Sequence, residues 1–451
     1  MNRVILVALA FVIATSTALK MKLQDGPVSG LCDTTVKSLS GYFSVSETLS
    51  KNYFYWFFES RAAPSTDPLV IWLTGGPGCS SQLALLSENG PCKVSEDGLS
   101  TYNNPNSWNN NANILWVDQP SDVGYSYGAK VDHNETEVAE DMYHFVQEFL
   151  KAHPEYAKLE LYIFGESYGG HYAPAVSNRI FQGNKKNDGI FVNLKGVGVG
   201  NGLTDPVIQY QYYPAMAMNN TYGVKAVTEE QYEKMLQHLP ACTLMGAACQ
   251  ANVDACEYAY TFCNLFETTP FYNSGLNPYD IRVPCGENDL CYNFTNIEIF
   301  LNLESTRKAL GVSDKVEKWQ SCNNAVNLMF VNDWMRNFHK ELIEMLENDV
   351  RVLIYAGDVD FICNWMGNKA WTQALQWSGK EGFNAETDHN WMYNNGEKDV
   401  HGGFVRTGRA VQGKGSLTFL QVFEAGHMVP MDQPAAALSL LNTFLTNKDF
   451  Y

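Results

Sequence analysis

The clearest candidate for chemistry in the sequence is a serine in a glycine-rich turn. The stretch G-E-S-Y-G at residues 165–169 matches the pattern G-x-S-x-G and follows the apolar run Leu161–Phe164. Where a strand leads into such a turn and a helix follows, the glycines allow a turn tight enough to expose the serine hydroxyl. We therefore predict that Ser167 is a nucleophile.

A serine nucleophile needs a histidine base and a carboxylate that orients the histidine. In proteins with this turn, the acid and then the histidine follow the serine along the chain. Asp358 and Asp360 both follow a short apolar run that we predict to be a strand, and spacing alone does not choose between them. His427 follows another such run in a glycine-containing loop, and His401 is its nearest competitor.

A second glycine-rich loop could stabilise the negative oxygen that forms when a serine attacks a carbonyl. The loop T-G-G-P-G-C-S-S at residues 74–81 follows the apolar run Leu69–Leu73. Glycines allow close approach of the backbone, and an oxyanion needs N–H donors. We predict one donor from Gly76 and one from Tyr168, the residue after the nucleophile. The loop lacks the lysine and spacing of a phosphate-binding motif, which argues against a nucleotide site.

These residues require a scaffold of strands and helices. Short apolar runs bounded by turn-forming residues predict strands at Tyr53–Phe58, Leu69–Leu73, Ile114–Val117, Leu161–Phe164, Val197–Val199, Val352–Tyr355 and Leu417–Val422. Apolar residues at helical spacing predict helices over Glu137–Lys151 and Asp333–Asn348. Strands that alternate with helices predict an α/β fold with a mostly parallel sheet flanked by helices.

One stretch interrupts this alternation. Residues 203–320 contain few predicted strands but six of the eleven cysteines, and a cysteine recurs every seven residues from Cys242 to Cys263. We interpret this stretch as a disulfide-braced subdomain inserted between two parts of the core, residues 19–202 and 321–451.

The N-terminus and the sequons indicate the secretory pathway. Residues 1–18 have a charged start, a short apolar run and small residues before a cleavage site near Ala18, as in a signal peptide. This run is too short to span a membrane, and we expect no other span. The sequons at Asn134, Asn219 and Asn293 then predict surface glycans. Vacuole, lysosome and secretion all remain open as destinations.

The amino-acid composition argues against two classes of protein. The chain has 451 residues, of which 45% are hydrophobic and 13% aromatic, and this excludes a disordered protein. The formal net charge of −18 argues against nucleic-acid binding, which needs lysine and arginine opposite phosphates. Because the eleven cysteines are an odd number, at least one thiol has no partner within the chain.

Four motifs together resemble the serine carboxypeptidase family: W-L-T-G-G-P-G-C-S-S, G-E-S-Y-G-G-H-Y, Y-A-G-D-V-D-F-I-C-N-W and G-H-M-V-P. The similarity extends over essentially the whole mature chain. It implies an α/β-hydrolase fold with an inserted cap, acting on the C-termini of peptides and proteins at acidic pH without a metal or cofactor. It also selects Asp360, rather than Asp358, to complete a triad with Ser167 and His427.

The resemblance implies a site for the free carboxylate of the substrate, formed by Trp72, Thr74, Gly75, Glu88 and Glu166. Thr74 stands where the family usually has asparagine, so an amide donor is replaced by a hydroxyl that can still donate one hydrogen bond. Two adjacent glutamates cannot both ionise cheaply, so the pKa of one should rise, and its protonated carboxyl can donate to the substrate. We therefore expect substrate binding to weaken as the pH rises.

The resemblance further suggests a substrate side-chain pocket lined by Tyr168, Leu203, Tyr210, Tyr213, Trp334, Ile362, Cys363 and Met428. It suggests the disulfides Cys79–Cys322, Cys242–Cys263, Cys249–Cys256 and Cys285–Cys291. Cys32–Cys92 follows only by elimination. Cys363 then remains as a free thiol near the substrate.

Two other functions remain open at this point. The same family includes acyltransferases, which pass an acyl group to an alcohol, and a member that stabilises partner enzymes. The presence of both Glu88 and Glu166 favours the peptidase. The sequence leaves the side-chain preference, the choice between monomer and homodimer, and internal cleavage undecided.

Overall fold

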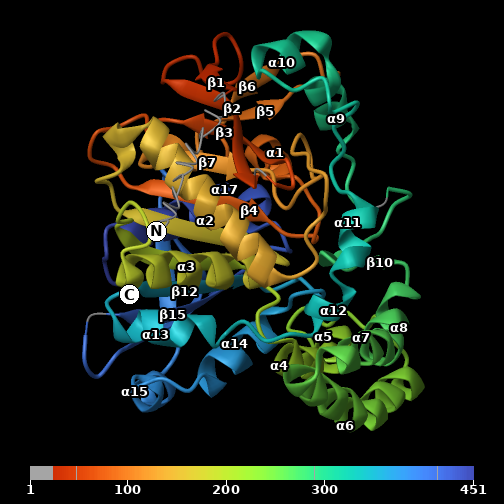
Figure 1. Ribbon diagram of the computed structural model, residues 1–451. Coiled ribbons are helices and arrows are strands. Elements are labelled where there is room, and N and C mark those ends of the chain that lie inside the picture. Colours follow the sequence, from red (N-terminus) through yellow and green to blue (C-terminus); the bar gives the residue numbers. More distant parts are fainter. Residues whose placement is uncertain (1–23, 47, 289, 414) are drawn as a thin grey trace, which may run out of the picture.

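A large central sheet organises the protein (Figure 1). The computed structural model describes residues 24–451 except residues 47, 289 and 414, so the predicted signal peptide lies outside the described residues. The sheet has eleven described strands in the order β1-β2-β3-β7-β4-β8-β9-β12-β15-β14-β13. The six strands from β7 to β15 run parallel, and antiparallel strands form both edges.

The strands of this sheet are β1 (Gln24–Pro27), β2 (Ser38–Ser46), β3 (Lys51–Phe58), β4 (Leu69–Thr74), β7 (Asn113–Val117), β8 (Leu161–Glu166), β9 (Leu194–Gly200), β12 (Arg351–Gly357), β13 (His389–Asn394), β14 (Asp399–Arg409) and β15 (Ser416–Val422). All seven predicted strands lie within this sheet. Two short strands, β5 (Cys92–Val94) and β6 (Thr101–Asn103), pair separately. The predicted α/β class with a mostly parallel sheet is confirmed.

Strand side chains alternate between two hydrophobic cores, one on each face of the sheet. In β3, Tyr55 and Phe57 belong to one core, whereas Phe54, Trp56 and Phe58 belong to the other. Successive side chains of a strand point to opposite faces, so a strand that is covered on both sides must be apolar throughout. This explains why the central strands could be recognised as continuous apolar runs.

Helices cover both faces. The first core contains apolar residues of α2 (Glu135–Ala152), α3 (Gly169–Lys186), α13 (Glu341–Glu347), α14 (Trp365–Ala374) and α15 (Lys380–Ala385). The second core contains residues of α1 (Ser81–Ser87), α16 (Val429–Asp432) and α17 (Pro434–Leu445). The stripe predicted for α2 is buried, and the Asn134 side chain caps this helix by accepting a hydrogen bond from the backbone N–H of Glu137 at 3.1 Å.

The helix predicted over residues 333–348 is wrong as a single element. The structure has two short helices, α12 (Val331–Trp334) and α13, separated by irregular backbone. In the gap, the N–H of Asn337 donates to the side chain of Gln250 at 2.9 Å, and the N–H of Phe338 donates to the carbonyl of Thr204 at 2.8 Å. These tertiary hydrogen bonds replace the helical ones, which the apolar spacing could not reveal.

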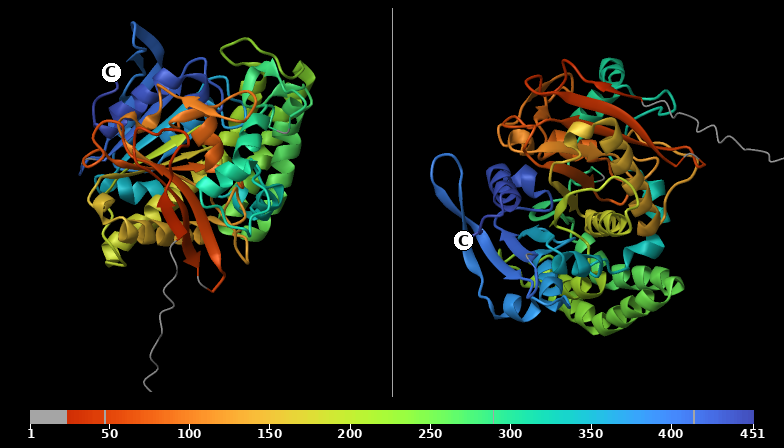
Figure 2. Two further views of the ribbon diagram at one scale, coloured as in Figure 1. Left: turned by 90° about the horizontal axis from the view of Figure 1, so that it is seen from above. Right: turned by 60° about the vertical axis from the view of Figure 1, so that its left-hand side comes forward.

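The chain between β9 and β12 forms most of the remaining helices. They are α4 (Pro206–Gln209), α5 (Tyr213–Met218), α6 (Glu229–Ala251), α7 (Cys256–Cys263), α8 (Thr269–Tyr272), α9 (Thr295–Asn302), α10 (Glu304–Ala309) and α11 (Asn324–Met329), with a π-helical turn at Asn264–Thr268 and a hairpin of β10 (Leu276–Asn277) and β11 (Asp280–Pro284). Helices α4–α8 gather at one end of the molecule, whereas α9 and α10 lie beside β5 at the other (Figures 1 and 2).

Two predictions from the sequence concerned membrane-spanning helices and surface glycans. Within the described residues, no helix is long and apolar enough to cross a membrane. Asn219 and Asn293 of the predicted sequons are exposed, and Asn134 is half-buried as the cap of α2. The exposed side chains offer room for the glycans predicted at these two positions.

Candidate active site

The turn that carries Ser167 joins β8 to α3 at the carboxyl edge of the parallel sheet. Ser167 has a φ of 62°, which a residue other than glycine adopts only where its surroundings hold it. The neighbouring glycines explain how: a Cβ on Gly165 would lie 2.3 Å from the carbonyl oxygen of Gly169, and one on Gly169 would lie 2.7 Å from that of Leu73. The turn can therefore close only with glycine at both positions.

Asp360 and His427 come from the loops that follow β12 and β15, which are neighbouring strands. Nδ1 of His427 lies 2.9 Å from Oδ2 of Asp360, and both side chains are buried. The same oxygen accepts hydrogen bonds from the side-chain amide of Asn201 at 2.8 Å and from the N–H of Cys363 at 3.2 Å. Asp360 is thus an acceptor held in place from several sides, suited to orienting the imidazole.

The other candidate acid and base lie elsewhere in the described structure. Asp358 accepts hydrogen bonds from the Tyr222 hydroxyl at 3.0 Å and the N–H of Glu424 at 2.9 Å, so it fastens the end of β12 to the loop after β15. His401 is exposed on β14 and packs edge-on against Phe404 and Phe423. The geometry therefore joins His427 to Asp360.

The glycine-rich loop after β4 packs directly against the Ser167 turn. A Cβ on Gly75 would lie 2.3 Å from the backbone nitrogen of Tyr168, so these two backbones are in close contact. The disulfide Cys79–Cys322 ties the loop to the chain before α11, and the N–H of Ser80 donates to the carbonyl of Ser321 at 2.8 Å. Gly76 lines the same cavity as Ser167. The loop is therefore held where its N–H groups could face a bound carbonyl.

A cavity of about 160 Å³ opens beside Ser167 and contains the glutamate pair. Its lining includes Thr74, Glu88, Glu166, Ser167 and His427. The lining also includes Met428, together with Leu83, Tyr279, Leu290, Tyr292 and Phe294. The cavity thus combines two buried carboxyl groups with apolar walls next to the candidate nucleophile and base.

Burial strongly favours the protonated forms of the two glutamates. It raises the pKa of Glu88 to about 7, against the opposing effects of Glu166 and the nearby ammonium of Lys93. It raises the pKa of Glu166 well above its usual range, and the neighbouring Glu88 raises it further. At acidic pH this pair is uncharged and can donate hydrogen bonds to an anion.

Thr74 completes the polar part of this cavity, and Trp72 is its hydrogen-bond partner. The indole N–H of Trp72 donates to Oγ1 of Thr74 at 2.9 Å, and both residues are buried. Since the threonine oxygen already accepts this bond, its own O–H is left to donate to another group. This arrangement shows how a threonine can offer a donor here in place of the amide that the resemblance would lead one to expect.

A second cavity, of about 330 Å³, also borders Ser167, and we call it the aromatic cavity because six of its fifteen lining residues are aromatic. The residues predicted for the side-chain pocket that line it are Tyr168, Leu203, Tyr213, Trp334, Ile362 and Cys363. Tyr210 supports this lining, because its hydroxyl accepts a hydrogen bond from the Trp334 indole at 2.9 Å. Met428 lies in the first cavity instead. Gly76, Ser167, Tyr279 and Asn327 border both cavities.

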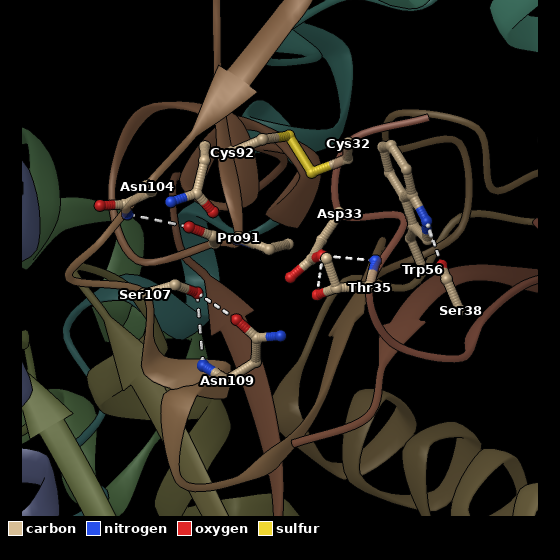
Figure 3. Close-up of a disulfide and its surroundings, with 12 residues drawn as sticks. Cys32, Asp33, Thr35, Ser38, Trp56, Pro91, Cys92, Asn104, Ser107 and Asn109 are labelled. Carbon is tan, nitrogen blue, oxygen red and sulfur yellow. Dashed lines mark hydrogen bonds between the residues drawn. A yellow bond between two sulfur atoms is a disulfide. The ribbon is translucent and has the colours of Figure 1, made fainter. Parts of the chain in front are cut away.

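The structure forms the same five disulfides that were expected, and Cys363 is a buried free thiol. Figure 3 shows Cys32–Cys92, the pair that followed only by elimination, which links the chain before β2 to the start of β5. Arg61 connects the same two segments, since its guanidinium binds Asp33 at 2.7 Å and the carbonyl of Pro91 at 3.0 Å.

Comparisons with known proteins agree with this geometry. A family model described as serine carboxypeptidase matches residues 29–447. The carboxypeptidase Y of Candida albicans is 42% identical over 432 residues, which cover 95% of this chain and 76% of that protein. The chain belongs to the serine carboxypeptidase family. A serine carboxypeptidase-like protein of Oryza sativa subsp. japonica is also 42% identical, over 89% of this chain and 91% of that protein.

A solved structure shows the fold of this serine carboxypeptidase. Kex1Δp, a prohormone-processing carboxypeptidase from Saccharomyces cerevisiae, matches with a TM-score of 0.82 and 25% identity over 93% of this chain and 95% of that one. The predicted α/β-hydrolase fold is thereby confirmed, as is the assignment to a family of hydrolases that act on peptide C-termini.

The sequence analysis missed two residues that contact the Asp360–His427 pair. Asn201, directly after β9, bonds Asp360 and also accepts from the N–H of Gly357 at 3.0 Å. Tyr279, from the turn between β10 and β11, packs its ring 5.0 Å from that of His427 and accepts the His427 N–H on its carbonyl at 2.8 Å. The position of Asn201 at a strand end was a usable clue, whereas that of Tyr279 depends on how the intervening helices fold.

Proposed function

We propose that this serine carboxypeptidase hydrolyses the last peptide bond of peptides and proteins with Ser167, His427 and Asp360, and that it does so at acidic pH. The observation that carries this proposal is the location of the buried Glu88 and Glu166 in one cavity with Ser167 and His427. A general esterase has no need for two protonated carboxyl groups beside its nucleophile. An enzyme that must bind a free C-terminal carboxylate needs such hydrogen-bond donors.

The reaction follows from the roles of the three side chains. Ser167 Oγ attacks the carbonyl carbon of the last peptide bond while His427 accepts the hydroxyl proton, and Asp360 orients the imidazole and stabilises its charge. The N–H groups of Gly76 and Tyr168 stabilise the oxyanion. The C–N bond then breaks as His427 returns the proton to the leaving amino acid. Water, activated by the same histidine, hydrolyses the acyl-enzyme.

The two cavities divide the substrate between them. The C-terminal residue occupies the smaller cavity, where its carboxylate accepts hydrogen bonds from the protonated glutamate pair, from Thr74 and from the backbone of Gly75. The preceding residue places its side chain in the larger aromatic cavity. Within the predicted insertion 203–320, helices α4–α8 serve as the cap that supplies much of this lining, since Tyr213 and Tyr260 come from them.

The compartment follows from the same chemistry. An enzyme whose substrate site depends on protonated glutamates suits an acidic vacuole or lysosome, or an acidic extracellular medium. Five disulfides and the sequons fit a protein that passes through the secretory pathway. We include cleavage near Ala18 and glycosylation at Asn134, Asn219 and Asn293 in the proposal, and mass spectrometry of the secreted protein tests both.

Release of a free amino acid from a blocked dipeptide at about pH 5 tests the function. We expect release by the wild-type protein and none by Ser167→Ala. Transfer of the acyl group from an activated ester to an alcohol, without peptide hydrolysis, would indicate an acyltransferase instead. A stabilising effect on a partner enzyme that survives Ser167→Ala would indicate a binding role.

A further inference from the structure

A buried carboxyl group holds the side chain of the residue that follows the nucleophile. The Tyr168 hydroxyl donates to Oδ2 of Asp333 at 2.9 Å, and both side chains are almost fully buried. The backbone of Tyr168 belongs to the Ser167 turn, and its ring lines the aromatic cavity. This hydrogen bond therefore connects α12 to the backbone at which the oxyanion forms.

The helix that carries Asp333 packs around the same tyrosine. Phe330, directly before α12, lies with its ring 5.8 Å from that of Tyr168, and Trp334 lies with its ring at 5.5 Å. His171 stacks on Tyr168 at 4.3 Å from within α3. Asp333 is thus the polar contact at the centre of an aromatic cluster, and Trp334 next to it forms part of the cavity wall.

A second carboxyl group, that of Glu135, accompanies Asp333. Glu135 begins α2, is 1% exposed, and has no hydrogen-bond partner for either carboxylate oxygen. Burial and the charge of Asp333 raise the pKa of Glu135 well above its usual range. Burial raises the pKa of Asp333 to about 7. Like Glu88 and Glu166 in the smaller cavity, this pair is uncharged at acidic pH.

Helix α7 packs against α12 and contributes Tyr260, whose ring lies 5.7 Å from that of Trp334, and the remaining ionisable groups come from other elements around Asp333. They are Glu135 on α2, Asp132 before α2 with its partners Lys51 and Tyr53 on β3, Tyr168 at the turn, His171 and Tyr172 on α3, and Arg336 after α12. Burial lowers the pKa of His171 to about 4, so its ring is neutral over most of the relevant range. Two carboxylic acids, Glu135 and Asp132, stand against two cations, Lys51 and Arg336, but Lys51 already pairs with Asp132. Arg336 is then the cation that is left to compensate a charge on Asp333.

We propose that Asp333 is a positioning residue for catalysis: by accepting the Tyr168 hydroxyl it fixes the backbone that presents Ser167 and the oxyanion N–H, and it aligns this backbone with α12. This inference rests on the proposed function and extends it. Removing the contact should lower kcat rather than raise KM, because the contact supports the transition state and touches neither the glutamate pair nor the substrate carboxylate.

Ionisation of Asp333 places a buried negative charge on the group that accepts the hydroxyl of Tyr168, the residue directly after the nucleophile. kcat should therefore fall as the pH rises through about 7, whereas the glutamate pair acts on KM. The two buried carboxyl pairs, Glu88 with Glu166 and Asp333 with Glu135, thus control different kinetic constants.

A double-mutant cycle with a blocked dipeptide at pH 5 tests this contact. We expect Asp333→Ala and Tyr168→Phe each to lower kcat about tenfold with KM changed less than about twofold, since small misplacements of reacting groups have effects of this order. The double variant should lose no more than either single one, because both remove the same interaction. Tyr143→Phe is the matched control: it removes another buried tyrosine hydroxyl, bonded to the carbonyl of Asp188, and should leave kcat within about twofold.

A loss of about 100-fold in the double variant, or single variants with kcat within about twofold of wild type, would overturn the proposal. Asp333→Asn keeps an acceptor for Tyr168 and covers the case in which Asp333→Ala fails to fold. This variant should keep wild-type kcat at pH 5 and lose the decline in kcat above pH 7, and an unchanged pH profile would equally refute the inference. Activity in Ser167→Ala would instead refute the proposed function.

Discussion

Replacement of the glutamate pair in the smaller cavity should remove the pH dependence of substrate binding. Burial raises the pKa of Glu88 to about 7 and that of Glu166 well above its usual range, so the pair is protonated at pH 5 and Glu88 loses its proton near pH 7. Loss of this proton removes one donor and leaves a negative charge that repels the substrate carboxylate. If binding follows the protonated fraction, KM changes little from pH 5 to 6 and rises about tenfold by pH 8, or ~1.4 kcal/mol of binding free energy.

The variant Glu88→Gln/Glu166→Gln keeps neutral donors at both positions and cannot ionise there. We expect its KM for a blocked dipeptide to stay within about twofold between pH 5 and pH 8. Initial rates over a range of substrate concentrations at each pH provide the test. Glu96→Gln, which changes an exposed glutamate in the loop after β5, should behave as the wild type.

A matched substrate separates this effect from other titrations. A blocked dipeptide amide has no free carboxylate, so its KM should not rise with pH through repulsion by the glutamate pair. A wild-type KM for the free acid that is flat from pH 5 to pH 8 would refute the reasoning. So would a double variant in which the tenfold rise persists.

Three further predictions follow from the structure. Gly169→Ala should abolish activity and lower the Tm measured by calorimetry, because the alanine Cβ would lie 2.7 Å from the Leu73 carbonyl oxygen. A variant with normal Tm and activity would contradict the packing of the turn. The Glu267 side chain is fully buried without a hydrogen-bond partner, and burial raises its pKa to about 8. Between about pH 5 and 8 the native state therefore keeps a proton that the unfolded state releases. Because of this difference, the free energy of unfolding falls as the pH rises over that range. Glu267→Gln should reduce this fall in Tm, and an unchanged fall would refute its cause. Cys363 lines the aromatic cavity, and burial raises the pKa of its thiol, so mercurials should inhibit while iodoacetamide reacts slowly; inhibition of Cys363→Ser by mercurials would contradict this role.

The sequence predicted the parts of the structure that depend on local pattern. Strands buried on both faces are continuous apolar runs, so the run at residues 53–58 was recognisable as β3. The glycines around Ser167 marked its turn because no other residue fits there. Spacing alone did not distinguish Asp358 from Asp360, and the resemblance to the family selected Asp360.

Features that depend on tertiary contacts could not be predicted in this way. The apolar spacing of residues 333–348 fits one helix, but hydrogen bonds from Asn337 and Phe338 to other segments break it. Asn201, Tyr279 and Asp333 act through partners that are distant in sequence, and none of them lies in a recognisable motif. Burial, which sets the pKa values of both carboxyl pairs, is likewise a property of the folded chain.

Mass spectrometry of the acyl-enzyme tests the central claim most directly. The protein is mixed with an activated ester at about pH 5, quenched in acid and digested, and the modified peptide is sequenced. We predict a single acyl group on Ser167, which is absent from Ser167→Ala. An acyl group on another residue, or peptide hydrolysis by Ser167→Ala at a rate close to wild type, would contradict the account.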